Sequence, residues 1–147
     1  MEAGYIWEEY LSLAYAHRLA HRPGEVTLDG ITGSPDGIAE DPFGEAHIAV
    51  EEYKYTWRSA RNLPSTVWWW MTQGKSYCHM MGTNVLILRV FYSQGDYSGS
   101  GPFPRMYWIG FEPEELLSNW RMITTHALMM KDKTRASMMN KKGDSRG

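Results

Sequence analysis

The sequence of 147 residues is long enough to bury one hydrophobic core and too short for two ordinary domains. A hydrophobic share of 43% and a charged share of 22% are typical of a folded globular protein, which argues against a disordered or fibrous chain. The single cysteine, Cys78, excludes an internal disulfide, a four-cysteine zinc site and a cysteine-ligated iron–sulfur cluster. Because no apolar run approaches the ~20 residues of a membrane span and the first residues lack a signal-peptide pattern, we expect a cytoplasmic protein without a membrane partner.

Charge is unevenly distributed along the chain, although the net charge is only −2. Residues 131–147 contain six basic and two acidic residues, a local charge of +4, which leaves −6 for residues 1–130. The weak periodicity of the basic end predicts a flexible C-terminal tail over residues 131–147, following a single domain over residues 1–130. Such a tail could contact nucleic acid or only keep the protein in solution. The acidic body argues against simple phosphate binding unless some of its carboxylates hold a cation.

The first half of the chain predicts a helix followed by strands. Good helix formers over residues 4–21 give way to Pro23 and Gly24, which end the helix. Residues 26–38 contain turn signals at Asp29-Gly30 and Pro35-Asp36-Gly37 around a short strand pair. Alternation then predicts a strand over residues 47–57, with the even-numbered positions on one face and the odd-numbered positions on the other.

The second half predicts a helix, two strands and a last helix. Pro64 opens a helix that runs to about Met81 and ends at Gly82. Residues 85–92 are nearly all apolar, as in a central strand buried on both faces, and a loop over 93–104 leads to a strand over 106–111. Apolar residues spaced by three and four predict an amphipathic helix starting near Pro113. The order of elements predicts an α/β fold of mixed α+β type, with a central mixed sheet flanked by helices.

A charged pair, Glu52 and Lys54, stands on the strand expected over residues 47–57. The two side chains share a face, because residues two apart in a strand project to the same side. Alone, such a pair is usually a solvated ion pair of small energetic value. Here Ile48 and Val50 occupy the same face, which should be buried, and a half-buried charge needs a partner or a function.

Two further pieces accompany this pair. Asp36, in a turn between strands, can lie beside the carboxylate of Glu52, and two carboxylates with a carbonyl and waters provide the hard oxygen ligands that Mg²⁺ or Mn²⁺ prefers. Gln73 and Tyr77 are four apart, so their amide and phenol share one helix face and can both point at a phosphate. The alternative for the second piece is that Tyr77 packs in the core and Gln73 hydrogen-bonds to it.

In this order, the pieces resemble the motifs of the PD-(D/E)xK nuclease superfamily, specifically its Gln-x-x-x-Tyr branch, which includes RecB-type nuclease domains and phage lambda exonuclease. The segment Gly4-Tyr5-Ile6-Trp7-Glu8 is similar to the first-helix motif of that branch. The resemblance implies a restriction-endonuclease-like core and a DNA nuclease of bacterial or phage origin that depends on Mg²⁺ or Mn²⁺. An exonuclease is favoured over an endonuclease, because the branch is rich in enzymes that process DNA ends.

The resemblance also implies roles for individual residues. Asp36 and Glu52 would be direct metal ligands, with the carbonyl of Tyr53 as a third and Glu8 holding the metal directly or through water. Lys54 would orient the attacking water or offset charge on the phosphorus. Such a site fits phosphodiester hydrolysis, which needs an activated water and neutralised charge at the scissile phosphate.

Further residues are expected to contact DNA. Gln73 and Tyr77 would position the phosphate and the strand, again by resemblance. Arg58, Arg61 and Lys75 are candidate phosphate contacts by their charge and position, with an exposed, solvated location as the alternative.

Several alternatives stay open at this point. The chain could be an endonuclease of the same fold, or a non-catalytic module that binds DNA or assembles with other proteins. It lacks a phosphate-binding loop of the ATPase type, so any helicase or recombination partner would be a separate chain, and a second copy is also a possible partner. Of the consecutive residues Trp68, Trp69 and Trp70, one or two should be core and one can face DNA or a partner, because successive helical residues point in different directions.

Overall fold

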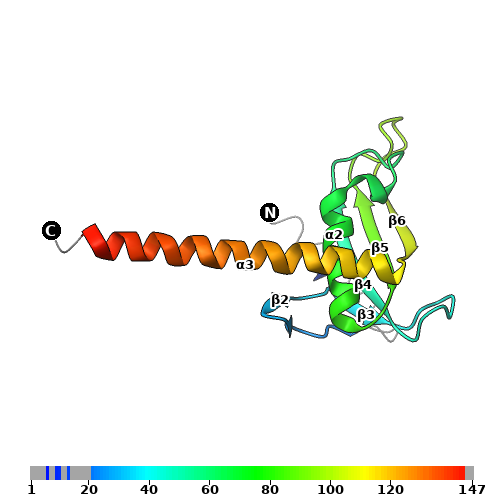
Figure 1. Cartoon of the computed structure of the whole chain (residues 1–147). Coiled ribbons are helices and arrows are strands. Elements are labelled where there is room, and N and C mark those ends of the chain that lie inside the picture. The colour runs from blue at the N-terminus through cyan, green and yellow to red at the C-terminus, as the bar shows by residue number, and fades with distance from the viewer. Residues whose placement is uncertain (1–5, 7–8, 11–12, 14–20, 145–147) are drawn as a thin grey trace.

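A computed structural model describes residues 6, 9, 10, 13 and 21–144 of the chain, with side chains up to residue 139. Most of the helix expected over residues 4–21 lies outside the described residues, and so do Gly4 and Glu8 of the first-helix motif. The body consists of a mixed sheet, a helix packed on one of its faces and a long C-terminal helix that crosses that helix (Figure 1).

Four strands form the sheet in the order β3-β4-β5-β6. Their bounds are Gly37–Ala39 for β3, Ala49–Thr56 for β4, Val85–Tyr92 for β5 and Phe103–Gly110 for β6. The pairs β3/β4 and β5/β6 are antiparallel, and β4/β5 is parallel. A parallel pair needs a crossover connection, which α2, Trp68–Met81, provides. The predicted fold class, a mixed sheet flanked by helices, is therefore confirmed.

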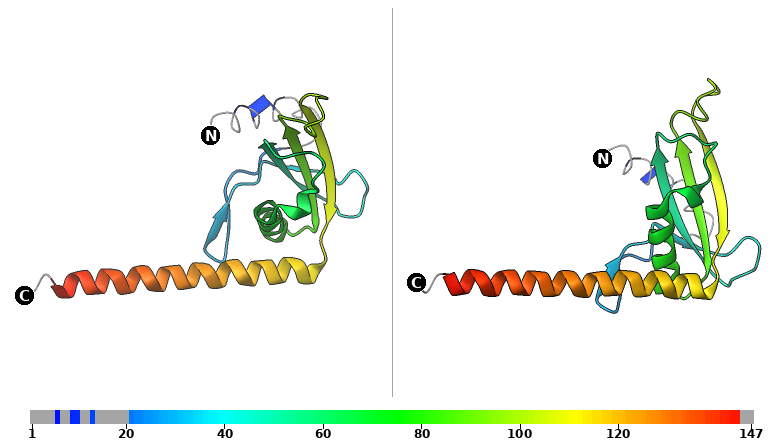
Figure 2. Two further views of the ribbon diagram at one scale, coloured as in Figure 1. Left: turned by 90° about the horizontal axis from the view of Figure 1, so that it is seen from above. Right: turned by 45° about the horizontal axis from the view of Figure 1, so that its top comes forward.

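A separate hairpin precedes the sheet. Its strands β1, Val26–Leu28, and β2, Ile31–Gly33, turn at Asp29-Gly30 as predicted, and both turn residues have positive φ. Figure 2 shows the hairpin on the same side of the sheet as α2. Its chain leads directly into the turn that carries Asp36.

The core lies between α2 and the sheet. Val50 and Leu88 from the central strands pack against Trp70 and Cys78 of the helix, and all four are buried. Gly74 permits this approach, since a Cβ atom there would lie 2.5 Å from Cδ2 of Leu86. The strand predicted over 85–92 has the bounds of β5, and the predicted helix end at Gly82 is confirmed by its left-handed conformation, with φ of 69°.

Some predicted boundaries were wrong. The helix expected from Pro64 is interrupted at Val67, so that η1, Pro64–Thr66, forms a separate 3₁₀ turn before α2. Strand β6 starts at Phe103 and not at Met106, because Phe103–Arg105 continue the antiparallel pairing with β5.

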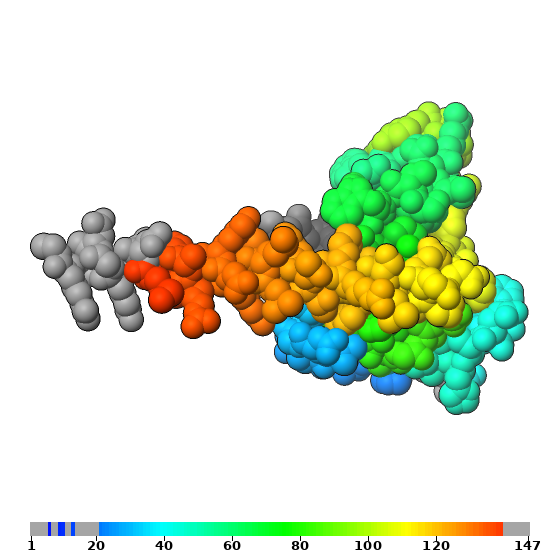
Figure 3. All heavy atoms as spheres, viewed as in Figure 1, coloured from blue at the N-terminus to red at the C-terminus, as the bar shows by residue number. Residues whose placement is uncertain are grey.

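The largest difference from prediction concerns the C-terminal end. Helix α3, Pro113–Asp144, continues 14 residues past Met130, where a flexible tail was expected. Lysine, arginine, alanine and methionine make up more than half of residues 131–144, which contain no proline, so local propensity permits helix there even though residues 131–139 are all exposed. Figures 2 and 3 show this half of α3 projecting away from the body.

The first half of α3 is anchored on the body. Leu116 and Trp120 are buried, and the Trp120 ring stacks on His79 of α2 with centroids 4.9 Å apart. The Trp120 Nε1 also donates a hydrogen bond of 2.8 Å to Oδ2 of Asp29 in the hairpin turn. No helix among the described residues has the length and apolar character to cross a membrane.

Candidate active site

The face of β4 that packs toward α2 carries the predicted charged pair. Glu52 and Lys54 follow Val50 along that face, as the alternation predicted. The Lys54 Nζ lies 2.8 Å from Oε2 of Glu52. Glu52 is only 2% exposed and Lys54 is half-buried, so this pair is largely shielded from solvent and is not a solvated surface pair.

Asp36 is held beside this pair by main-chain hydrogen bonds. The N–H of Tyr53 donates to Oδ2 of Asp36 at 2.8 Å, and the N–H of Asp36 approaches Oε1 of Glu52 at 3.4 Å. The antiparallel register explains the placement, since Gly37, the first residue of β3, pairs with Glu51. The structure thus places Asp36 beside Glu52, close enough for the Asp36 charge to act on the Glu52 carboxyl group.

The polar residues of α2 complete the arrangement from the opposite side. Lys54 Nζ donates to Oε1 of Gln73 at 2.7 Å, and Nε2 of Gln73 approaches the Tyr77 hydroxyl at 3.2 Å. Five predicted residues, Asp36, Glu52, Lys54, Gln73 and Tyr77, thus belong to one hydrogen-bonded network. The alternative considered for Tyr77 holds in part, because its ring is half-buried and Gln73 does bond to it.

Tyr77 is also positioned by the hairpin. A Cβ atom at Gly33 would lie 2.5 Å from Cε1 of Tyr77, so glycine lets β2 lie directly against the ring. The hairpin strand that leads to Asp36 therefore contacts the helix residue at the other end of the network.

Burial dominates the electrostatics of the two carboxyl groups. It raises the pKa of Glu52 from 4.5 to about 7, although the Lys54 ammonium lowers it, and the neighbouring Asp36 carboxylate raises it further. Burial also raises the pKa of Asp36, against the lowering effects of the Tyr53 N–H and Lys54. The buried Glu52 carboxylate and the half-buried Asp36 carboxylate disfavour each other's ionised form, and a bound cation would remove that penalty.

The oxygen atoms of the two carboxyl groups are ligands of the type that a hard divalent cation such as Mg²⁺ prefers. Asp36 and Glu52 are the two described residues that would hold it. Among the side chains that the structure describes, no group of three or more histidine, cysteine, aspartate or glutamate residues comes together. The expected further ligand Glu8 lies outside the described residues. Tyr53 contributes only its main chain here, since its hydroxyl donates to Oε2 of Glu51 on the other face at 2.7 Å.

The three candidate phosphate contacts have different surroundings. Arg58 is exposed and its guanidinium lies over the ring of Trp69, 4.9 Å from the centroid. Arg61 is also exposed and lies 3.6 Å from the carboxylate of Asp96.

Lys75 is not brought to the site. It pairs with Glu115 of α3 at 3.0 Å and lies over the ring of Phe111 at 5.4 Å. The reason is geometric: Lys75 is two residues from Gln73, which places it about 200° further around α2.

A second buried charged group, on the other face of β4, was not given a role from the sequence. Arg89 of β5 bonds to Oε1 of Glu51 at 2.8 Å, and Tyr53 bonds to the second oxygen of that carboxylate at 2.7 Å. The signal was an arginine within the otherwise apolar strand 85–92. This group ties β4 to β5 directly behind the candidate site.

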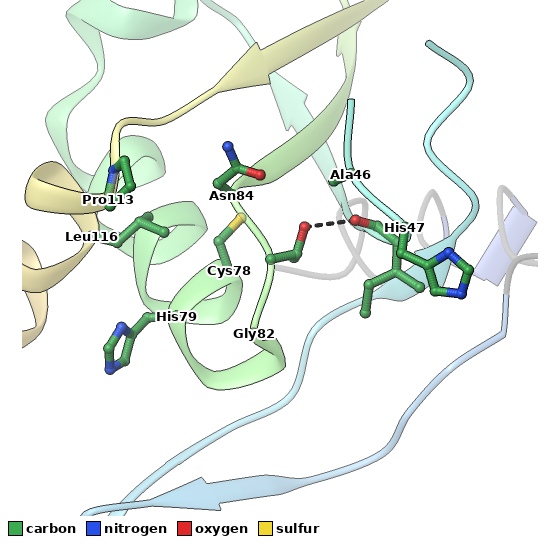
Figure 4. A pocket seen from close by; sticks show the side chains of 10 residues that line it. Ala46, His47, Cys78, His79, Gly82, Asn84, Pro113 and Leu116 are labelled. Atoms are coloured by element: carbon green, nitrogen blue, oxygen red, sulfur yellow. Dashed lines mark hydrogen bonds between the residues drawn. The ribbon is translucent and has the colours of Figure 1, made fainter. Parts of the chain in front are cut away.

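A cavity of about 410 Å³ lies away from this network, at the C-terminal end of α2 (Figure 4). His47, Cys78, His79 and Asn84 are among the residues that line it, and none of the five network residues does. Thr83 closes one side by donating a hydrogen bond of 2.6 Å to the carbonyl of Ile48. Burial raises the pKa of the Cys78 thiol to about 12, which makes it a poor nucleophile.

Comparison with known proteins gives information on the fold alone. No protein-family profile and no curated protein match this sequence. Among solved structures, the chain is similar to one described as "Crystal structure of SSO0001", with a TM-score of 0.51 and 15% sequence identity. The match covers 81% of this chain and 56% of that one, so the chain spans little more than half the length of this structural neighbour.

Proposed function

We propose that the protein is a DNA nuclease that depends on Mg²⁺ or Mn²⁺ and hydrolyses phosphodiester bonds, with exonuclease action at DNA ends favoured. The observation that carries the proposal is the network itself. Carboxylates from a turn and a strand, an ammonium from the same strand, and an amide and a phenol from a helix all meet at one place. Their order along the chain is the order of the motifs in the nuclease superfamily that the sequence resembles.

A divalent cation held by Asp36 and Glu52, with the Tyr53 carbonyl and Glu8 as expected further ligands, would supply an activated water and offset the charge of the scissile phosphate. The chain's own residues would do the rest. Lys54 Nζ bonds to Glu52 and Gln73, which leaves one of the three ammonium protons to donate to an oxygen whose negative charge grows in the transition state.

Gln73 and Tyr77 would hold the substrate in position. The amide oxygen of Gln73 accepts from Lys54 and so orients the ammonium. Its Nε2 donates to the Tyr77 oxygen, which keeps the phenolic proton as a donor toward a phosphate oxygen. Both roles concern the geometry of attack, which is where positioned side chains contribute most to phosphoryl transfer.

The surroundings suit a nucleic-acid partner. The projecting half of α3 contains Lys131, Lys133 and Arg135, all exposed, which would attract phosphates without base specificity. The same half exposes Met129, Met138 and Met139, and we propose that a second copy or a separate recombination protein covers them. We place the protein in the cytoplasm of a bacterial cell, or of an infected cell if a phage encodes it.

A second candidate is a non-catalytic module that binds DNA through the same fold. It is favoured by one observation, that only two carboxylates meet among the described residues. An endonuclease of this fold is the alternative within the catalytic account, and it differs by cutting DNA that has no ends.

The test is degradation of linear and of covalently closed circular DNA by the purified protein with Mg²⁺, with Mn²⁺ and with EDTA. We expect metal-dependent loss of linear DNA, abolished by Glu52→Ala and by Lys54→Ala. Lys75→Ala is the matched control, because it removes an ammonium that is two residues from Gln73 and pairs with Glu115, outside the network. Cutting of the closed circle would identify an endonuclease. A folded wild-type protein that cuts neither substrate with either metal would refute catalysis.

A further inference from the structure

Two residues lie beyond the network, Trp69 on α2 and Arg58 just past the end of β4. On α2, Trp69 precedes Gln73 by four residues and Tyr77 by eight, so the three side chains lie along one face of the helix. Arg58 is the second residue after Thr56, the last residue of β4, which shares a face with Glu52 and Lys54. Trp69 and Arg58 contact each other.

The contact is a cation–π pair in an exposed position. The Arg58 guanidinium carbon lies 4.9 Å from the centroid of the Trp69 ring, and Trp69 remains 45% exposed. The backbone N–H of Arg58 donates a hydrogen bond of 3.1 Å to Oγ1 of Thr56, which holds the chain at this bend. Trp68 meets the Trp69 ring edge-on at 5.8 Å. The adjacent indoles of Trp68 and Trp69 form an exposed aromatic surface on α2, and the Arg58 guanidinium lies over the Trp69 part of it.

We propose that Arg58 and Trp69 form the binding subsite for the nucleobase next to the scissile phosphate. This inference rests on the proposed function, since the position of the scissile phosphate follows from the network. The base would continue the stack that the guanidinium and the indole begin, as bases do on tryptophan and arginine planes in proteins that bind single strands. The arginine also offers a positive charge to the flanking phosphate.

The chemistry of the pair also predicts which nucleotides the subsite would accept. Stacking on an aromatic ring depends little on the identity of the base, because every base has a π face, so the subsite would be tolerant of sequence. Stacking also requires an unpaired nucleotide, because a base within a duplex is covered on both faces. The preferred substrate is then a strand that is single or frayed at the site of cleavage.

The experiment measures binding without cleavage. Fluorescence anisotropy in EDTA compares a labelled single-stranded oligonucleotide with versions that carry one abasic nucleotide at successive positions. For the wild-type protein we expect one position at which loss of the base weakens binding by roughly 5- to 100-fold. Trp69→Ala should weaken binding of the intact strand by a similar factor, and should then show no further loss at that abasic position.

Control variants separate the subsite from general effects. Trp69→Phe keeps a stacking ring and should retain most of the base dependence. Trp68→Ala removes a neighbouring exposed indole that lines a different hollow, with Lys75 and Glu115, and should keep the wild-type pattern. Thermal unfolding of each variant establishes that it folds.

The outcomes distinguish the inference from the proposed function. A folded Trp69→Ala protein that binds the intact strand as the wild type does, or that keeps the abasic loss at the same position, overturns the subsite. That result leaves the nuclease proposal intact if the wild type still degrades DNA. A wild-type protein that cuts nothing yet shows the abasic loss, which disappears in Trp69→Ala, refutes the nuclease and retains the base-binding subsite.

Discussion

Glu52→Gln should make the protein more stable at neutral and alkaline pH, although it removes one partner of a buried ion pair. Glutamine has nearly the shape of a protonated glutamate but carries no charge to bury. Burial raises the pKa of Glu52 from 4.5 to about 7, which corresponds to about 3 kcal/mol of unfavourable free energy for the ionised form. That figure already includes the attraction of Lys54, whose ammonium lowers the pKa.

The sign of the pH dependence follows from the direction of this shift. The folded protein keeps a proton on Glu52 that the unfolded chain releases between about pH 4.5 and pH 7. The folded state therefore binds more protons in that window, and the contribution of Glu52 to stability falls as the pH rises through it. Glutamine cannot titrate, so the variant and the wild type should have similar stability near pH 4.5, and the variant should be more stable by about 3 kcal/mol above pH 7.

Urea unfolding of both proteins at several pH values from 5 to 8, in EDTA, measures this difference. The exposed carboxylate of Glu45, in the loop before β4, provides the matched control. Glu45→Gln should change the free energy of unfolding by less than about 0.5 kcal/mol at every pH. The reasoning about the buried carboxyl group is refuted if the difference in the free energy of unfolding between Glu52→Gln and the wild type does not grow with pH. It is also refuted if Glu52→Gln is less stable than the wild type at pH 8.

The remaining predictions concern packing, charge and the cation. Glu51→Gln should destabilise the protein by about 3 kcal/mol in thermal or urea unfolding, because Arg89 loses a buried carboxylate partner; an unchanged midpoint would contradict a structural role for this pair. Gly74→Ala should lower the free energy of unfolding by about 1–3 kcal/mol, because the added Cβ would lie 2.5 Å from a methyl carbon of Leu86. Alanine has the better helix propensity, so a stabilised variant in the same assay would count against the packing described. Removal of residues 131–147 should change the free energy of unfolding by less than about 1 kcal/mol but reduce the salt dependence of DNA binding. Anisotropy titrations between low and high salt measure that dependence, and an unaltered slope would exclude this segment from the DNA contact. Mg²⁺ should raise the thermal midpoint of the wild type more at pH 8 than at pH 6, because the cation binds the ionised form of Glu52. An equal rise in the midpoint of Glu52→Gln would contradict binding of Mg²⁺ at this site.

Much of the candidate site could be predicted because its residues are set by local periodicity. The alternation in β4 places Glu52 and Lys54 on one face, and the helical spacing of Gln73 and Tyr77 places both on one side of α2. What brings the two sets together is the parallel pairing of β4 with β5 and the packing of α2 across them. The sequence resemblance supplied that long-range step, which periodicity alone does not contain.

The errors have a common physical origin in tertiary context. The face of Lys75 follows from its angle around α2, but its pairing with Glu115 depends on where α3 crosses that helix. The length of α3 beyond Met130 was missed because a basic, exposed segment without an apolar stripe was expected to have no fixed structure. The link between Glu51 and Arg89 requires the register of β4 and β5, which strand patterns do not determine.

The most direct test of the account is the rate at which the purified protein degrades linear DNA as a function of Mg²⁺ concentration. We expect a rate that is zero in EDTA, rises to saturation with Mg²⁺ or Mn²⁺, and is lost in folded Glu52→Ala and Lys54→Ala proteins but kept in Lys75→Ala. A folded wild-type protein that binds DNA and leaves it uncut at every metal concentration would contradict the central claim.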